Sequence, residues 1–427
     1  MPLEDHPLRY QLANELHARP FAALSCPGQA VYLAIKPPAE AAKRDRGLDR
    51  AHLLALLDRF GAQHPGPDAT HYFARLGRFQ LKWESHTEFV TYTAFLENGI
   101  DKPFDPDAWK VFPDDWLDTA PGTRITSAHI LYSEAPADPE QITEKLNDWF
   151  VPESLAVSSV LDDAAIIAGD FRIDSAGHMR FAVFTHPVSG DRRIGRVVQR
   201  ICEIETYKTM SMLGLPRANT VSRRMGEIDA KLTHLTNNLT SDTAQPVATL
   251  DELLEAAAEL EQLQTESAFR FGATGAYEAL VNQRIGVLRE TRFDGRQTFG
   301  EFMTRRFDPA MRTVKATERR LQGMTDRAIR AGDLLRTRVD VDRSAQNQQL
   351  LESMDKRSDL QLRLQKTVEG LSIVAISYYA VSLVGYLLAP FADPLGVDKA
   401  LLSALAVIPV VAAVWLVVRS IRRSIEK

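Results

Sequence analysis

The sequence predicts an α+β cytoplasmic domain followed by long helices and a C-terminal two-helix transmembrane hairpin. Up to residue 190, short runs rich in β-branched and aromatic residues alternate with turn residues. Charged segments that contain leucine and methionine follow, and prolines are sparse in them. Near the C-terminus, two uncharged runs each approach the roughly 20 residues that cross a bilayer as a helix. We therefore divide the chain into a mixed α/β domain at residues 1–190, a long-helix or stalk region at 191–367, and a hairpin with a basic tail at 368–427.

The mixed α/β domain is predicted to be a sheet flanked by helices. Strands are expected at residues 29–35, 78–84, 88–97, 123–132, 164–173 and 179–184. A helix is expected at 137–150, because Asp138 can cap it and Pro139 suits the first helical position. The run at residues 48–60 is a second candidate helix.

The long-helix region is predicted to end in a stalk that continues into the first uncharged run. Residues 248–263 form a candidate helix opened by a capping box that starts at Thr249. No proline occurs between Pro309 and Pro390, so we expect one helix to run from the cytoplasm into the bilayer. The arginine-rich stretch at 305–343 is interpreted as a solvated helix face with acidic partners, and a vestibule that attracts anions is the alternative.

The hairpin is predicted to cross the membrane at residues 371–391 and again at 400–418. The link between the crossings holds Pro394 and Gly396, which break a helix, and charged residues that resist entry into hydrocarbon. Basic residues flank both crossings, namely Arg357, Arg363 and Lys366 before the first and Arg419, Arg422 and Arg423 after the second. Because basic flanks stay on the cytoplasmic side, and because the N-terminus lacks the apolar core of a signal peptide, both termini are expected in the cytoplasm.

A stripe of uncharged side chains follows the predicted stalk into the first crossing. Alternating steps of three and four residues, the period of a helical seam, generate it. Its members are Ser344, Asn347, Leu351, Met354, Ser358, Gln361, Gln365, Val368, Ser372, Ala375, Tyr379, Ser382, Tyr386 and Ala389. The stripe has two interpretations. It lines a watery axis shared by several copies of the helix, or it is a packing seam on which small and hydroxyl residues allow close approach in lipid.

Composition and motifs exclude several classes of protein. The formal net charge of −5 and the lack of a basic motif with interleaved aromatics argue against a nucleic-acid partner. Two cysteines, Cys26 and Cys202, supply neither a disulfide framework nor the paired spacing of a zinc site. The chain has no GxxxxGK[ST], HExxH or GxSxG motif, so we do not expect an enzyme.

The segment "KWESHTEF" contains a candidate metal site. On a continuous strand, Glu84, His86 and Glu88 lie on one face, and the large apolar residues lie on the other. Carboxylate and imidazole groups suit a divalent cation, although alternate side chains on a strand are about 6.5 Å apart and need a further ligand from elsewhere. The alternative is a solvated sheet face.

The segment "ELHARPF" is predicted to be a corner between a helix and a loop. Glu15 and Arg19 are spaced for an ion pair on a helix, but Pro20 favours an extended Arg19 and ends the helix there. His17 and Arg19 then form a cation-rich recess for an acidic ligand, or meet the Glu84, His86 and Glu88 row. The alternative is a structural corner in which Arg19 binds local carbonyls and Phe21 packs inward.

This organisation resembles that of CorA-type divalent-cation channels. The shared features are an α/β domain in the cytoplasm, long helices, a stalk that enters the first of two C-terminal crossings, and basic residues at the end. The resemblance implies five copies around a pore lined by the stalk and the first crossing. The Gly-Met-Asn motif of those channels is missing, because "GYLLAPF" stands in its place.

The chain also resembles, over essentially its whole length, a bacterial family of uncharacterised membrane-anchored proteins. The segments "NELHARPF" (14–21), "KWESHTEF" (82–89) and "SMDKRSDLQLRLQKTVEGLSIVAISYY" (353–379) carry this resemblance. It implies a place in the bacterial inner membrane. We expect an oligomeric ion channel, transporter or ion sensor, with a divalent cation as the candidate cofactor. The alternative is a membrane-anchored cytoplasmic ligand-binding or scaffold protein without transport activity.

Overall fold

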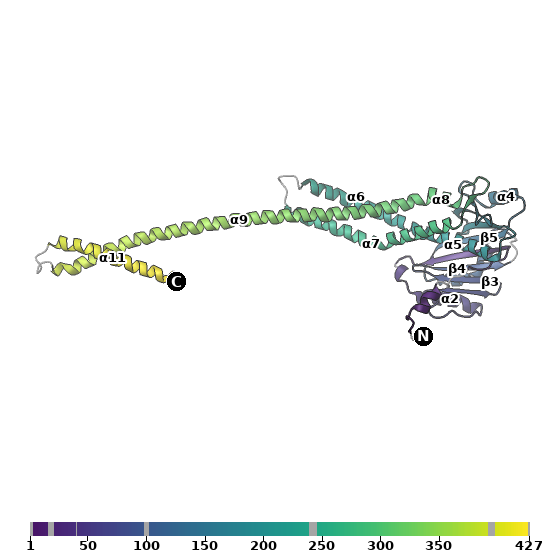
Figure 1. Ribbon diagram of the computed structural model, residues 1–427, viewed down its shortest axis with the longest axis horizontal. Helices are drawn as coiled ribbons and strands as arrows, with labels where there is room; N and C mark the ends of the chain where they lie inside the picture. The colour runs from purple at the N-terminus through teal and green to yellow at the C-terminus, as the bar shows by residue number, and fades with distance from the viewer. Residues whose placement is uncertain are drawn as a thin grey trace. The chain divides into compact units, whose positions relative to one another are not determined.

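The computed structural model describes residues 3–15, 21–39, 41–97, 102–238, 246–391 and 398–425 (Figure 1). The chain divides into two compact units. The first comprises Met1–Ala244 and Asp251–Ala331, and the second comprises Gln245–Leu250 and Gly332–Lys427. The first unit thus joins the predicted α/β domain to most of the predicted long-helix region. The predicted α+β class, with long helices and a C-terminal apolar helix, is confirmed.

The described residues of the first unit contain a nine-stranded sheet of order β2-β3-β4-β1-β5-β8-β7-β6-β9. Its strands are β1 (Gly28–Lys36), β2 (His71–Leu76), β3 (Phe79–Ser85), β4 (Val90–Glu97), β5 (Thr123–Glu134), β6 (Ala156–Val160), β7 (Ala165–Ile173), β8 (Met179–Thr185) and β9 (Thr291–Arg292). Neighbouring strands are antiparallel except β5 and β8, which are parallel. All six predicted strands are confirmed, and β2, β6 and β9 were not predicted.

Helices cover both faces of the sheet (Figure 1). The helices described before α9 are α1 (Arg9–Glu15), η1 (Ala41–Lys43), α2 (Arg46–Arg59), η2 (Pro106–Val111), α3 (Asp114–Leu117), α4 (Pro139–Trp149), α5 (Asp191–Met212), α6 (Gly214–Asn238), α7 (Pro246–Gly286) and α8 (Phe299–Arg306). On β1, Tyr32 and Ala34 pack into the core that includes α5, whereas Leu33 and Ile35 pack with α2. This alternation follows from the two-residue period of a strand buried on both faces.

The predicted helices are confirmed, with one correction at a helix start. In α4 the Asp138 carboxylate accepts from the Glu140 backbone N–H at 2.9 Å, and Pro139 is the first helical residue. The helix α7 begins at Pro246, before Thr249, so the predicted capping box does not open it. A capping box opens α8 instead, where Thr298 and Glu301 exchange hydrogen bonds with each other's backbone N–H groups.

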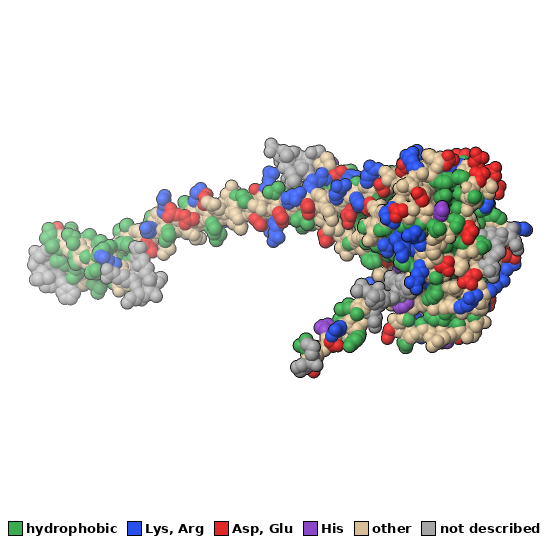
Figure 2. Space-filling view, turned by 45° about the vertical axis from the view of Figure 1, so that its right-hand side comes forward, with side chains coloured by type: hydrophobic (Ala, Val, Ile, Leu, Met, Phe, Trp, Pro, Cys, Tyr) green, Lys and Arg blue, Asp and Glu red, His purple; other side chains and the backbone are tan. Residues whose placement is uncertain are grey.

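The predicted unbroken helix is confirmed, because α9 runs over 81 residues from Asp308 to Leu388. The short η3 (Ala389–Phe391) follows it, and α11 (Lys399–Ile425) ends the described chain. Both α9 and α11 contain a stretch long and apolar enough to cross a membrane. Hydrophobic side chains cover much of the described surface of this hairpin (Figure 2). Most of the predicted link between the crossings, residues 392–397, lies outside the described residues.

Candidate functional site

A cavity of about 210 Å³ lies between one face of the sheet and α5. The residues that line it come from the segment before β1, from β1, β3, β4 and the turn after β3, and from α5 and α7. They are Phe21, Tyr32, Lys82, Glu84, His86, Phe89, Thr91, Thr93, Phe95, Gln199, Cys202, Glu203, Thr206, Tyr207 and Arg284. Two of the three segments that carry the family resemblance, "NELHARPF" and "KWESHTEF", therefore contribute to its wall.

The polar residues reach the cavity because of the alternation within β3. Phe79, Leu81 and Trp83 are buried in the core on the opposite face, as predicted. Lys82 and Glu84 consequently face α5. Their side chains are only 6% and 13% exposed, so the solvated sheet face considered from the sequence is wrong. The helix α5 covers this face and turns it into a closed polar wall.

A polar network follows this wall from β3 through α5 to α7. The Lys82 ammonium lies 3.2 Å from the Glu84 carboxylate and donates to the side-chain amide oxygen (Oε1) of Gln199 at 2.8 Å. The Gln199 amide donates to the Glu203 carboxylate at 2.8 Å, and Arg284 donates to the other oxygen of Glu203. The network contains two cations and two carboxylates, so a neutral ligand with separated charges would match it better than a simple ion.

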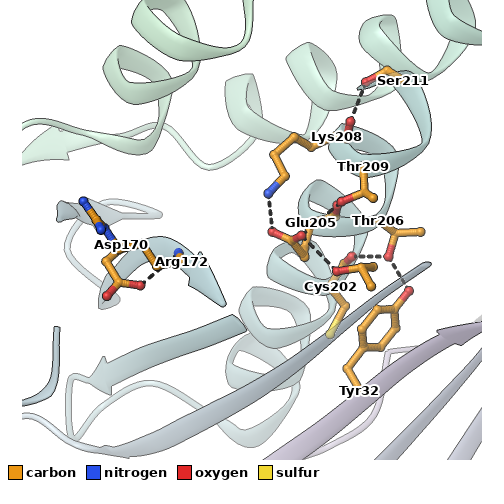
Figure 3. Close-up of polar contacts among 10 residues, drawn as sticks. Tyr32, Asp170, Arg172, Cys202, Glu205, Thr206, Lys208, Thr209 and Ser211 are labelled. Atoms are coloured by element: carbon orange, nitrogen blue, oxygen red, sulfur yellow. Dashed lines mark hydrogen bonds and ion pairs between the residues drawn. The ribbon is translucent and has the colours of Figure 1, made fainter. Parts of the chain in front are cut away.

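Hydroxyl contacts link β1 to α5 at three residues that line the cavity (Figure 3). The Tyr32 hydroxyl contacts the Thr206 hydroxyl, which donates to the Cys202 carbonyl at 2.8 Å. Burial raises the pKa of Cys202 and holds its thiol protonated, which does not suit a nucleophile. Glu205, on the same helix, is fully buried and accepts from Thr126 at 3.0 Å and from Lys208 at 2.7 Å. Its partners lie outside the cavity wall, so we interpret Glu205 as structural.

A close backbone contact fixes the segment that carries Phe21. The Ala22 carbonyl oxygen approaches α5 at Gly195, where an added Cβ would lie 1.8 Å from it. The Leu24 N–H also donates to the Asp191 carbonyl at 3.1 Å at the start of α5. These contacts place Phe21 at the cavity, where the Arg196 guanidinium lies 5.4 Å from the centre of its ring.

The "KWESHTEF" segment is not one continuous strand, because β3 ends at Ser85 and a turn follows. Arg44 holds this turn. Its guanidinium donates to the Ser85 hydroxyl at 3.1 Å and to the carbonyls of His86 at 2.7 Å and Phe89 at 3.2 Å. The His86 ring stacks on Phe89, and both line the cavity.

The turn separates the three residues of the predicted metal site. Glu84 and His86 line the cavity, whereas Glu88 is paired with Arg270 of α7 and its side chain is 2% exposed. Among the residues that the structure describes, no group of three or more His, Cys, Asp or Glu side chains is placed to hold a metal ion. The predicted row of Glu84, His86 and Glu88 on one strand face is therefore wrong, because it assumed a straight strand through Glu88.

The "ELHARPF" prediction falls largely outside the described residues. The helix α1 ends at Glu15, whose side chain is not described, and His17 and Arg19 belong to the gap at 16–20. Phe21 is described and lines the cavity. The ion pair, the recess and the local carbonyl contacts of Arg19 therefore stay predictions.

The uncharged stripe lies on α9, and most of its residues are not covered by α11. Asn347, Leu351, Met354, Ser358, Gln361, Gln365 and Ser372 are all exposed in this single chain. Tyr379 and Tyr386 are 69% and 80% exposed. The Ser372 and Ser382 hydroxyls donate to the carbonyls four residues earlier, at 2.8 and 2.9 Å, so their hydrogen bonding is already satisfied.

The hairpin contains a groove of about 410 Å³ where α9 meets α11. Ser382, Gly385 and Tyr386 line it from α9, and Leu402 and Ser403 line it from α11. A Cβ added at Gly385 would lie 3.5 Å from the Ser403 hydroxyl, an ordinary contact. The helices α9 and α11 are therefore close at this groove.

The sequence analysis missed the residues that complete the cavity and hold its turn. Gln199, Glu203 and Arg284 are far from β3 in the sequence, and a pair such as Glu203 with Arg284 leaves no local pattern. Arg44 and Arg270 likewise act over long sequence separations. A weak signal does exist on α5, because Gln199 and Glu203 are spaced to lie on one helix face.

The comparisons with known proteins identify a family. The sequence profile of the family described as "Protein of unknown function (DUF3422)" matches residues 4–425, which is nearly the whole chain. No curated protein matches the chain. No solved structure matches it. The predicted membership of an uncharacterised family is thereby confirmed, and the chain belongs to the DUF3422 family.

Proposed function

We propose that this protein is a membrane-anchored ligand-binding protein whose α/β domain binds a small zwitterionic molecule in the cavity under α5. The carrying observation is the enclosed network of two cations and two carboxylates that lines the cavity. An ammonium group of the ligand would contact Glu84 or Glu203, and a carboxylate would contact Lys82 or Arg284. The cavity, at about 210 Å³, is below the usual 300–1,000 Å³ of drug-sized sites, which favours a ligand of amino-acid size.

In this proposal α9 and α11 anchor the domain in the bacterial inner membrane with both termini in the cytoplasm. Their apolar stretches have the length that two crossings need. The arginines and lysines that flank them favour the cytoplasmic side for both ends. The binding domain would then sample the cytoplasmic pool of its ligand.

The test uses the full-length protein purified in detergent and a panel of L-alanine, L-glutamine, L-glutamate and glycine betaine. We expect at least one compound to raise the unfolding midpoint of the wild-type protein. In the paired variant Lys82→Met with Glu84→Leu, the stabilisation should be lost. The pair is changed together because removing one partner alone would leave a buried charge, whereas replacing both is often neutral for stability.

The matched control is Arg59→Gln with Asp115→Asn, which removes an exposed ion pair that does not line the cavity. This variant should respond to the panel as the wild-type protein does. The proposal is wrong if no compound shifts the wild-type midpoint, or if the Lys82 and Glu84 variant responds undiminished.

We keep an oligomeric channel as the second candidate function, because the Tyr379 and Tyr386 side chains on α9 are 69% and 80% exposed. Several copies of α9 would bury this stripe around a common axis, as the CorA-type resemblance implies. Ion flux through liposomes that contain the protein, compared with Tyr379→Leu and Ser382→Leu variants, tests this candidate. Intact oligomers without flux for any ion tried would reject it.

A further inference from the structure

A second cavity, of about 440 Å³, gathers cations near the end of β1. Three of its lining residues, Lys36, Lys43 and Arg270, are basic, and no acidic residue lines it within the described part of the chain. Leu213 and Phe269 supply apolar surface beside them. It shares no lining residue with the cavity under α5.

Lys36 is a buried cation whose hydrogen bonding is incomplete among the described residues. The residue is 7% exposed, and its ammonium donates to the Pro37 carbonyl at 2.9 Å. An ammonium group has three N–H donors, so further acceptors are needed. Burial, and then the neighbouring Arg270, lowers the pKa of Lys36. A negatively charged ligand would relieve both effects.

Arg270 also has a donor in need of an acceptor. Its Nη2 donates to the Glu88 carboxylate, but its Nη1 is buried and has no hydrogen-bond partner among the described residues. A buried N–H group without an acceptor costs free energy. The Nη1 group of Arg270 therefore calls for an acceptor that the described residues do not supply. Among the described residues, the three lining cations and the one Glu88 carboxylate leave two net positive charges at this cavity.

We propose that this second cavity binds a phosphate-bearing anion. Lys36 and Arg270 would donate to the phosphate oxygens, and the exposed Lys43 would contact them from the solvent side. Phosphate offers several acceptors to converging donors, and both arginine and lysine recognise it. Phe269, which is 51% exposed, and Leu213 would contact the organic group joined to the phosphate. A soluble phosphomonoester and a lipid with a phosphomonoester headgroup share this chemistry.

The test titrates the full-length protein in detergent with inorganic phosphate and with phenyl phosphate, at constant ionic strength and against chloride. Lys36→Met should weaken binding about tenfold or more, because a charge-assisted hydrogen bond is lost. Lys36 has no ion pair in the described structure, so this variant should still fold. Lys110→Met, at an exposed lysine paired with Asp107 outside this cavity, should change the affinity less than about twofold.

A second variant tests Arg270 without leaving the Glu88 carboxylate buried and unpaired. Arg270→Met combined with Glu88→Gln removes both charges of the buried pair, and it should also abolish phosphate binding. Equal affinity in the wild-type protein and Lys36→Met would overturn the proposal.

Two further arms identify the source of the phosphate. The protein is placed in nanodiscs of phosphatidylcholine with or without phosphatidic acid, and phenyl phosphate binding is measured. Displacement by phosphatidic acid supports a lipid headgroup, and undisturbed binding supports a soluble phosphomonoester. Phosphate binding and zwitterion binding are tested independently. The Lys36→Met variant should still show the rise in unfolding midpoint with the zwitterion panel.

Discussion

At the residue scale, several charged side chains of the first unit are buried, and each is paired with a polar or oppositely charged group. Lys82 is 6% exposed, yet it contacts both Glu84 and Gln199. Such groups cost free energy to desolvate and are retained only with good partners. The cavity wall is thus held together by the same groups that we propose to contact a ligand, and neutralising one of them alone would confuse lost binding with lost folding.

Two buried histidines predict how stability depends on pH. Burial, and then the nearby His178, lowers the pKa of His129 to about 4. Burial, and then the nearby Arg124, lowers that of His178 to about 4. The unfolded imidazoles titrate near 6.5, so the unfolded chain binds more protons between about pH 6.5 and pH 4. The stability that the neutral imidazoles contribute is complete above pH 6.5 and is lost as the pH falls towards 4.

The unfolding midpoint of the full-length protein should therefore fall over this window, by an amount that corresponds to at most about 3 kcal/mol for each imidazole. The double variant His129→Gln with His178→Gln should show a flatter profile, measured by thermal unfolding at several pH values. His64→Gln, at an exposed histidine, is the control and should follow the wild-type profile. Identical slopes in the double variant and the wild-type protein would contradict this assignment.

At the element scale, the fit between α5 and the segment before β1 decides whether the cavity forms. Gly195 permits that fit, because any side chain there would collide with the Ala22 carbonyl. Gly195→Ala should push this segment off α5 and lower the free energy of unfolding by about 1–3 kcal/mol. It should also weaken the response to the zwitterion panel, since Phe21 would leave the cavity wall.

The matched control for this prediction is Gly226→Ala in α6, where an added Cβ meets no atom within 4 Å. This change should raise stability by about 0.5–1 kcal/mol, because alanine favours a helix over glycine. Chemical or thermal unfolding of the two variants compares them directly. Equal stability changes in both variants would show that the close contact at Gly195 has no energetic role.

The elements also show where sequence reasoning succeeds and where it fails. Period-two patterns located β1, β3, β4, β5, β7 and β8, because each of these strands carries enough buried β-branched or aromatic residues. The short β6 and β9 lack such a run, and β2 is largely exposed. The alternating pattern wrongly predicted a continuous strand beyond Ser85. The alternation of residue types continues through the turn, which Arg44 holds although it is distant in sequence.

At the scale of the whole molecule, the continuous α9 and the apolar hairpin were predictable from composition, because a missing proline and a missing charge are local properties. The cavity was not predictable. It depends on α5 covering the polar face of β3, and on Arg284 meeting Glu203 across 81 positions of sequence. Three of its polar lining residues, Lys82, Glu84 and His86, belong to a segment that the sequence did single out, although for a different site.

The central claim is that a zwitterion occupies the space between β3 and α5, and the reactivity of Cys202 tests it most directly. Cys202 lines the cavity, whereas the half-buried Cys26 lies outside it and contacts Thr185 at 3.3 Å. In the full-length protein, modification by methyl methanethiosulfonate is followed at both thiols by peptide mass spectrometry. We predict that Cys202 reacts more slowly than Cys26, and that a compound which raises the unfolding midpoint slows Cys202 further and leaves Cys26 unchanged. A Cys202 rate that no member of the panel alters, even at saturating concentration, would contradict the proposed ligand site.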